Sequence, residues 1–448
     1  MTLASGVATA QGPSSDPRFR GGDGAAAKGL TWVKAAGGRA RQHGGMDIKH
    51  APNSFPLAAI AAAPHRLLFF IGAFNVIAAM AWWTAWLGGA MPAPTVPAGW
   101  MHGFVMQYQV LPAFIFGFLL TVFPRWMGQT EASRWHYLPV GLGLVAGQVL
   151  TLSGLATGSA MLVHLGAVNT VAGWIAAMAV LAGWLFRDRA TTWHALSCFA
   201  ALVMGLAGLL AFVVFLHLPD PRLAFAMLKI GTFGLLVPVY ATVAHRMFPF
   251  FAANVVPGYV PWRPMGWLAA LWPLCLAHLG LELAHLHQWL WLVDAPLVVL
   301  TGYALWRWWP RGPMPPLLRV LFVGFAWLPI GLALYLAQSA WFAATGEFAL
   351  GRAPVHALSV GFFGSLLVAM VTRVTQGHSG RPLELGRIPA LAFVGMQLVA
   401  MVRVAAEAVP DPAPWMLAAG LGWLAVFTPW VLRSLWIYAT PRADGRPG

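Results

Sequence analysis

The sequence contains few charged residues for its length. Charged side chains make up 9 % of the 448 residues, whereas hydrophobic residues make up 59 %, including 24 Trp and 27 Phe. Soluble domains hold about 25 % charged residues and cover their surfaces with them. This composition therefore excludes an ordinary soluble protein, and it predicts a protein whose surface faces lipid.

Cysteine is almost absent. The two cysteines, Cys198 and Cys275, each lie inside an apolar run and not in a loop. This number excludes a disulfide framework, a cysteine-bound iron–sulfur cluster and a covalent C-x-x-C-H haem attachment. Any haem would have to be noncovalent, with histidine as the expected ligand.

Acidic residues are outnumbered by basic ones, which gives a formal charge of +14. In a soluble protein such an excess suggests a nucleic-acid partner, but that function needs a continuous basic face. Here the arginines are scattered between apolar runs. We therefore expect no nucleic-acid partner, and we interpret the arginines as signals of membrane orientation.

Long apolar windows follow one another along most of the chain. A helix rises about 1.5 Å per residue, so about 20 apolar residues cross a hydrocarbon core of about 30 Å. The sequence therefore predicts an all-α polytopic bundle of about twelve transmembrane helices in a lipid bilayer. The predicted spans are 66–88, 101–124, 137–157, 160–185, 192–216, 224–246, 265–284, 288–308, 317–344, 354–373, 388–407 and 414–437.

The regions outside these windows divide the chain into three parts. Residues 1–50 are rich in Gly, Ala, Arg and Ser without apolar periodicity, which predicts a disordered tail. Met46 is an alternative start within it, and no cleavable signal peptide is recognisable because the first apolar stretch is long and distant from the N-terminus. Residues 51–440 form the predicted transmembrane domain, and residues 441–448 form a short C-terminal tail.

Basic residues are concentrated in every second predicted loop. Cytoplasmic loops hold an excess of Lys and Arg, and here only Arg222 and Arg352 fall on the side opposite to the others. Both termini are therefore predicted to be cytoplasmic. Lys229 and Arg403 are the basic residues within spans, and each is expected to reach the nearer interface. The predicted inner set is Arg125, Arg134, Arg187, Arg189, Arg246, Arg263, Arg307, Arg311, Arg319, Arg373, Arg381, Arg387, Arg433, Arg442 and Arg446.

Histidines are the candidate site residues, because an ionisable side chain inside a membrane is costly and usually functional. His102 and His356 each open a predicted helix on the outer side. Neutral imidazole is a good ligand for haem iron and copper, and two facing helices can supply an axial pair. The alternative is that both are interfacial histidines bonded to water or backbone.

Three further segments carry grouped polar residues. His278, Glu282 and His285 share one helical face, as a small metal or proton site would require, but the loop that follows favours the wet end of a helix. His245 ends a span with a basic neighbour. Residues 372–382 are rich in donors able to hold an anion such as a haem propionate. The alternative for the last two is a positive-inside anchor with a tight turn.

Four segments together resemble the NnrS family of bacterial inner-membrane proteins. His356–Gly361 reads H-A-L-S-V-G, and Thr372–Leu383 reads T-R-V-T-Q-G-H-S-G-R-P-L, similar to the family's H-A-L-x-V-G and R-x-x-x-G-H-x-G-R-P patterns. Gly117–Gly128 resembles G-F-L-L-T-A-x-P-N-W-T-G, and Arg246–Phe251 resembles R-x-I-P-F-F. The resemblance covers about residues 55–440.

This resemblance implies haem and copper as cofactors and a role in responses to nitric oxide, nitrosative stress and denitrification. It adds His245, His378, Arg373 and Arg381 as cofactor-binding candidates beside His102 and His356, with Met106 as a further metal ligand. The family's H-x-H-E-M run reads His102-Gly-Phe-Val-Met106 here, which removes one histidine and the glutamate, and copper is therefore the second expectation after haem.

Two alternative functions remain at this point. Twelve spans with several internal prolines are also typical of a transporter for a metal or small solute, which predicts flux and no haem spectrum. A membrane assembly or signalling protein without catalytic function, anchoring partners through its arginine-rich loops, predicts a stable complex and no bound metal. The residues do not identify a catalytic group, so enzymatic activity stays open.

Overall fold

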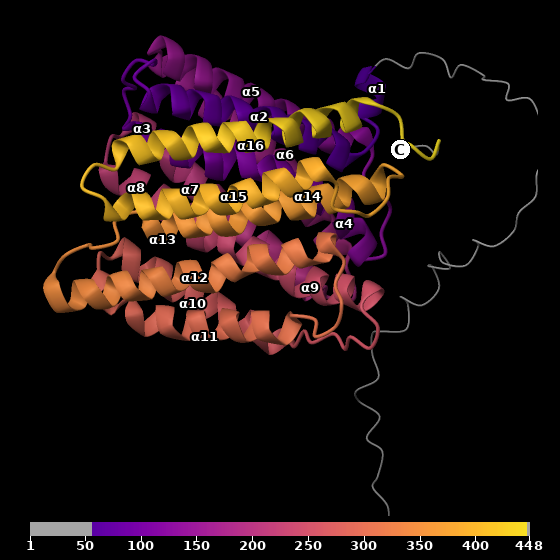
Figure 1. Ribbon diagram of the computed structural model, residues 1–448. Helices are drawn as coiled ribbons and strands as arrows, with labels where there is room; N and C mark the ends of the chain where they lie inside the picture. Colours follow the sequence, from indigo (N-terminus) through magenta and orange to yellow (C-terminus); the bar gives the residue numbers. More distant parts are fainter. Residues whose placement is uncertain (1–55, 446–448) are drawn as a thin grey trace, which may run out of the picture. The chain divides into compact units, whose positions relative to one another are not determined.

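The computed structural model describes residues 56–445, and this part of the chain is helical throughout, with no β-strand between its first and last residue. The predicted N-terminal tail lies outside the described residues, together with His43 and His50. Long helices lie side by side and alternate in direction (Figure 1). The predicted all-α fold is confirmed.

Each predicted span corresponds to one helical rod, and three rods contain a π-helical segment. The bounds are α2 (Pro64–Leu87), α3 (Ala98–Phe104) with η2 (Val105–Val110) and α4 (Leu111–Trp126), α5 (Arg134–Thr157), α6 (Ala160–Arg187), α7 (Trp193–His217), α8 (Pro221–Lys229) with η3 (Ile230–Leu236) and α9 (Val237–Val255), α10 (Met265–Leu283), α11 (Trp291–Trp308), α12 (Pro316–Thr345), α13 (Ala353–His356) with η5 (Ala357–Gly364) and α14 (Ser365–His378), α15 (Arg387–Ala405) and α16 (Ala413–Ala439). Short helical turns are α1 (Pro56–Ile60), η4 (His287–Trp289) and η6 (Ala406–Ala408).

Eleven of these rods, within the described range, are long and apolar enough to cross a membrane. Of the twelve predicted spans, the one that does not meet this criterion is α11, which has 18 residues and carries Asp294 and Arg307. It lies between α10 and α12 in the sequence and packs along both. The protein is therefore a multi-pass membrane protein, as its composition indicates.

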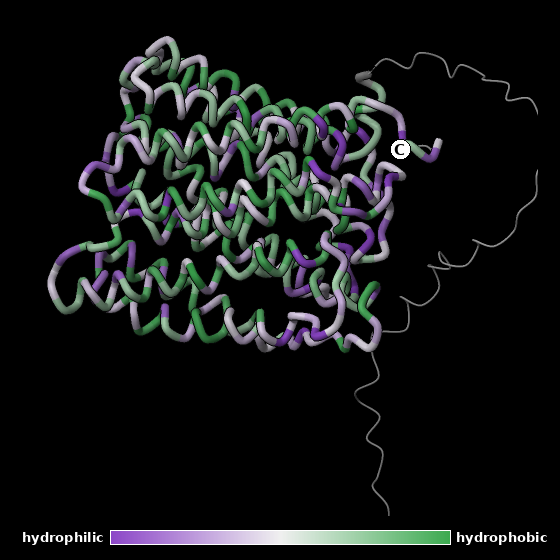
Figure 2. The backbone as a smooth tube through the Cα atoms, viewed as in Figure 1, coloured by the Kyte–Doolittle hydropathy of each residue, from purple (hydrophilic) through white to green (hydrophobic). Residues whose placement is uncertain are grey.

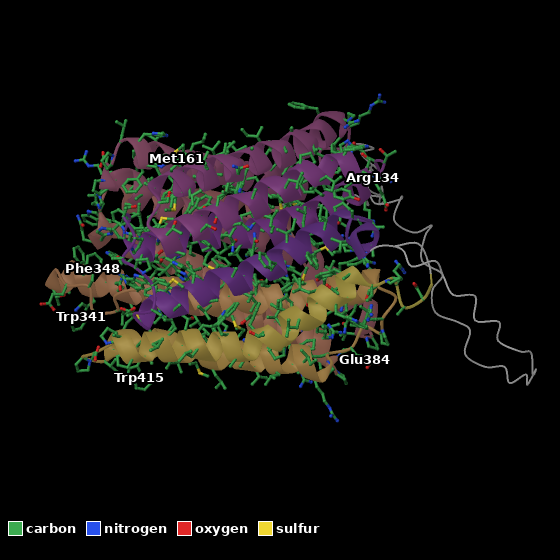
Figure 3. All side chains as sticks on the ribbon, turned by 90° about the horizontal axis from the view of Figure 1, so that it is seen from above. Arg134, Met161, Trp341, Phe348, Glu384 and Trp415 are labelled. Atoms are coloured by element: carbon green, nitrogen blue, oxygen red, sulfur yellow. The ribbon has the colours of Figure 1, made fainter. Side chains whose placement is uncertain are left out.

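The bundle has two distinguishable ends. The guanidinium of Arg66 at the start of α2 donates a hydrogen bond to the Tyr438 carbonyl near the end of α16, at 2.8 Å. We call this the terminal end, and Arg134 and Glu384 lie there (Figure 3). The opposite, distal end holds Trp341. Hydrophilic segments gather at the two ends, with apolar helices between them (Figure 2).

The arginine distribution predicts that the terminal end faces the cytoplasm. Reporters fused after Gly128, Pro313 or Pro441 are expected to report a cytoplasmic location, because these positions lie at the terminal end. Reporters fused at Ala93 or Gly346, at the distal end, are expected to report a periplasmic location. The measurement is paired phosphatase and fluorescent-protein fusion activity, and the same location for Gly128 and Ala93 would contradict this topology.

Prolines explain two of the three π-helical segments. Pro112 and Pro238 each follow a π-helical segment within two residues. Because proline has no N–H group, the carbonyl one turn earlier loses its helical partner. The Tyr108 carbonyl, which Pro112 leaves free, accepts a hydrogen bond from the Trp174 indole at 3.0 Å instead. π-helical turns are rare and often occur at functional sites.

Candidate functional site

A cavity of about 380 Å³ opens at the distal end and reaches the middle of the bundle. Its volume is in the range of small-molecule and cofactor sites. All three π-helical segments contribute to its wall, through Met106 of η2, Thr232 of η3 and Phe363 of η5. The three π-helical segments of the described residues thus all lie around this one cavity.

The cavity brings His102 and His356 together, although 254 positions separate them in the sequence. The ring of His102 stacks on Trp83 with the centroids 4.3 Å apart and the planes at 19°. His356 Nδ1 lies 2.9 Å from the Arg352 carbonyl. A carbonyl only accepts, so Nδ1 carries the proton and Nε2 keeps a free lone pair. Metal-binding histidines are commonly oriented by this type of bond.

Basic residues surround the two imidazoles. Arg352 and Arg403 both line the cavity, and Arg403 forms an ion pair with Glu407 at 2.7 Å. The Arg403 side chain is only 9 % exposed, which differs from the expectation that it reaches the interface. Its position beside the two histidines could not be read from the sequence, because hydropathy gives the depth of a residue but not the direction of its side chain.

Arg373 and Arg381 lie away from this cavity. Arg373 is on the same continuous helical rod as His356, and 17 residues at 1.5 Å each separate them by about 25 Å. Arg373 stacks over Phe251 at 4.0 Å, and Arg381 lies over Trp436 at 5.3 Å. The structure therefore does not bring these arginines to His356, and the predicted anion site is not part of the cavity.

His245 and His378 also lie at the terminal end, where each pairs with another histidine. His245 Nδ1 is 2.9 Å from His194 Nε2, and its Nε2 donates to the Pro264 carbonyl at 3.1 Å. The rings of His65 and His378 are 4.4 Å apart at their centroids. The end opposite to His102 and His356 thus holds two histidine pairs, in which His378 is half-buried and the other three histidines are buried.

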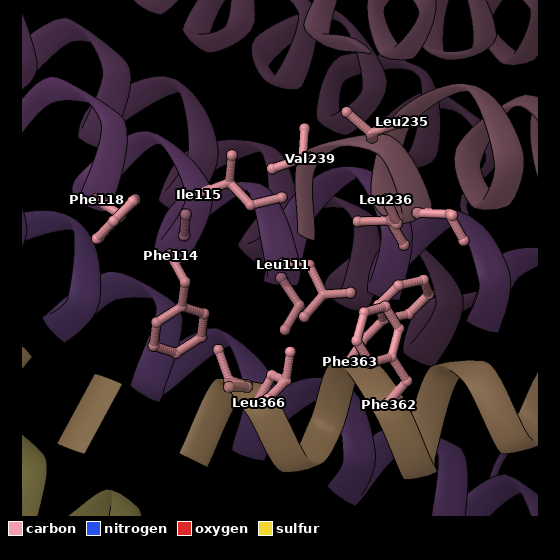
Figure 4. Close-up of a cluster of buried hydrophobic side chains, with 14 of the residues drawn as sticks. Leu111, Phe114, Ile115, Phe118, Leu235, Leu236, Val239, Phe362, Phe363 and Leu366 are labelled. Carbon is pink, nitrogen blue, oxygen red and sulfur yellow. The ribbon is translucent and has the colours of Figure 1, made fainter. Parts of the chain in front are cut away.

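Apolar side chains separate the two ends of the interior. Figure 4 shows Leu111, Phe114, Ile115 and Leu366 facing residues of η3 and η5. A small apolar cavity of about 70 Å³ lies among these layers, and Leu367 lines both it and the larger cavity. Apolar side chains therefore lie between the distal cavity and the terminal histidines.

A second polar group, which contains His278 and Glu282, lies beside the cavity. From the sequence, these residues are expected at the solvent-exposed end of a helix, together with His285. His278 is fully buried, and Glu282 is 3 % exposed. Only His285 is exposed, so the expectation is wrong for the first two residues. His278 Nδ1 lies 2.6 Å from Asp294 Oδ1 of α11. Asp294 could not be predicted as part of this group, because the apolar residues around it hide it in a hydropathy average.

Lys229 belongs to this group and also lines the cavity. Its ammonium lies 2.8 Å from Glu282 Oε2, and its side chain is 24 % exposed. The sequence predicts that Lys229 reaches the membrane interface. In the structure it instead pairs with Glu282 inside the protein. His287, in the turn outside the spans, lies 3.6 Å from Glu282 Oε2. Burial lowers the pKa of His287 below its ordinary value, so its ring is neutral at pH 7.

Residues 56–445 contain no cluster of three or more His, Cys, Asp or Glu side chains arranged to hold a metal ion. A metal in the cavity would therefore depend on the two imidazoles and on the Met106 thioether, which lines the same wall. This donor set suits a metal that is already held by an organic ring, and imidazole and thioether are also ligands that copper accepts.

Comparison with known proteins agrees with the motifs. No curated protein matches the chain. The family model described as NnrS protein matches residues 59–442. This range includes every transmembrane helix, His102, His356 and the buried network around Glu282. The chain therefore belongs to the NnrS family.

Proposed function

We propose that this protein binds haem in the distal cavity and acts in the bacterial inner membrane in tolerance of nitric oxide and nitrosative stress. The observation that carries the proposal is the meeting of His102 and His356 in one cavity. We choose haem as the cofactor and nitric oxide as the small molecule because the family is associated with haem, copper and nitric oxide.

The residues of the cavity fit a haem group. Two neutral imidazoles are a common axial pair for haem iron, and His356 presents the nitrogen that its backbone bond leaves free. Trp83, Trp423 and Phe363 supply apolar wall. Arg352 and Arg403 would hold the propionates, since guanidinium groups bind carboxylates strongly. Bound ferrous haem would supply affinity for nitric oxide.

Copper is the second proposed cofactor. Imidazole nitrogen and thioether sulfur are both copper ligands, and His102 and Met106 line the same cavity. The second histidine and the glutamate of the family pattern are replaced in this chain by Phe104 and Val105. Copper binding would thus compete for the same histidines as haem, and metal analysis separates the two.

A transporter for a metal or small solute is the alternative function. It requires a path between the two ends of the bundle, whereas apolar side chains occupy the interior between the distal cavity and the terminal histidines. This arrangement favours a binding site over a through path for a polar solute. An assembly or signalling role does not explain why two half-buried histidines share a cavity.

The proposal is tested by growth under nitric oxide. A strain lacking this protein is expected to show prolonged growth arrest when a nitric oxide donor is added, because a protective binding site is lost. Complementation with the wild-type chain or with His217→Ala is expected to restore growth, since His217 is exposed and does not line the cavity. Full rescue by His356→Ala would contradict the proposed role.

A further inference from the structure

Four ionisable side chains from three neighbouring helical rods form one buried network. Lys229 precedes η3, His278 and Glu282 lie on α10, and Asp294 lies on α11. The Lys229 ammonium is 2.8 Å from Glu282 Oε2, and His278 Nδ1 is 2.6 Å from Asp294 Oδ1. His278 Nε2 is 3.6 Å from Glu282 Oε1, which joins the two pairs.

Burying these four ionisable groups costs free energy that apolar residues in the same positions would not cost. Removing charges from water carries a large desolvation penalty, and apolar residues of similar size often stabilise a protein equally well. The network is also incompletely bonded, since His278 Nε2 and Asp294 Oδ2 are buried without a hydrogen-bond partner. Ionisable groups inside membranes usually mark ion or proton pathways.

The network is continuous from the distal surface to the cavity. At its outer side, His287 Nδ1 lies 3.6 Å from Glu282 Oε2, and the ring of His287 contacts the exposed His285. At its inner side, Lys229 lines the cavity. Tyr335 also lines the cavity, and its ring meets the His278 ring edge to face at 5.1 Å.

The charges of the network give it a defined response to a proton. Two carboxylates face one ammonium, so the network is electrically neutral when one further proton is held by His278 or by one of the carboxylates. A further proton leaves a net positive charge in a medium of low dielectric, where it needs a partner. An electron added within the cavity, next to Lys229, would be such a partner.

We propose that Glu282, Lys229, His278 and Asp294 form a proton-uptake site beside the cavity, which gains one proton when one electron is added within the cavity. The proton enters through His287 and is held by the network at the Glu282 carboxylate. It leaves by the same route when the electron leaves, so that proton and electron charges balance. His278 and Asp294 balance the charge of Glu282. The ionisable groups that face the network are His278, Cys275, Asp294, His285, His287, Lys229 and Tyr335.

The first test measures the reduction potential of the bound haem against pH, and this arm rests on the proposed function. One proton taken up per electron gives a slope of about 59 mV per pH unit, since 59 mV is a tenfold change for one electron. The wild-type protein is expected to approach this slope. Glu282→Gln is expected to flatten it, whereas Glu282→Asp keeps a carboxylate and is expected to retain most of it.

The matched control is Glu347→Gln, because Glu347 is an exposed carboxylate at the same end and outside the network. Its slope is expected to equal that of the wild type. Haem content and gel-filtration profile verify folding for each variant, and Lys229→Met replaces Glu282→Gln as the test if the latter does not fold. A flat wild-type slope, or an unchanged slope in the folded Gln or Met variant, would overturn the proton-uptake site.

A second test needs no haem. Dicyclohexylcarbodiimide reacts with protonated carboxyl groups in apolar surroundings, and mass spectrometry locates the product. Labelling of Glu282 or Asp294 in the purified chain is expected, faster at acidic than at alkaline pH and lost at the substituted residue in Glu282→Gln or Asp294→Asn. If the wild type contains no haem, the proposed function fails and labelling alone decides whether the network takes up a proton. No labelling of either residue at any pH would refute this uptake.

Discussion

Replacing His356 by alanine is expected to remove the haem from the purified protein. The substitution deletes the imidazole whose Nδ1 is bonded to the Arg352 carbonyl and whose Nε2 is free for iron. Loss of a group that merely orients a metal ligand costs about 10- to 100-fold in affinity, so loss of the ligand itself should cost at least as much. The haem-to-protein ratio from the visible spectrum measures the effect.

His102→Ala is the companion variant, because His102 lines the same cavity from another helix. It is expected to lower haem content or to convert a low-spin spectrum into a high-spin one. His217→Ala and His136→Ala are the controls, and both should retain the wild-type spectrum. If His356→Ala and His102→Ala both keep an unaltered spectrum, the ligands must be sought among His65, His194 and His245 at the terminal end.

Adding one methyl group at Gly143 is expected to destabilise the bundle. A Cβ atom there would lie 2.5 Å from the Gly173 Cα atom, a backbone contact that a side-chain rotation cannot relieve. Gly143→Ala therefore forces α5 and α6 apart, and overpacking of this kind costs about 1–3 kcal/mol. In membranes such close helix pairs depend on small residues, because the helices gain little from the hydrophobic effect. The thermal midpoint in detergent should fall.

Gly302→Ala is the control for this prediction. Gly302 lies in α11, and no atom is within 4 Å of the position where its Cβ would stand. Alanine favours helix over glycine by about 1 kcal/mol, so the midpoint should stay unchanged or rise slightly. A Gly143→Ala protein as stable as the Gly302→Ala protein would show that α5 and α6 are not packed as closely as described.

The helices could be predicted from the sequence because they depend on local composition. A membrane removes backbone hydrogen bonding to solvent, so every long apolar window must become a helix. The predicted span 317–344, for example, corresponds to α12, Pro316–Thr345. The predicted span 288–308 differs at its start, because its first residues form η4 before α11 begins at Trp291. The start of α2 and the end of α16 lie at the same end of the bundle, and the cytoplasmic location of both termini stays a prediction.

The grouping of the candidate site residues could be predicted only in part. His102 and His356 were recognised from motif and depth, and the structure places them in one cavity. Arg373 was grouped with them through the motif alone, although the rise of a helix already separates it from His356 by about 25 Å. The link between Lys229 and Glu282 depends on contacts between distant helices. No window of sequence contains that information.

The most direct test of the central claim is the visible absorption spectrum of the wild-type protein purified in mild detergent, with iron and copper analysis on the same sample. Haem bound by two imidazoles predicts a sharp Soret band with resolved bands on reduction, and iron in proportion to protein. Protein that is folded and monodisperse, yet shows no Soret band and no iron after expression with sufficient haem, would contradict a haem site between His102 and His356.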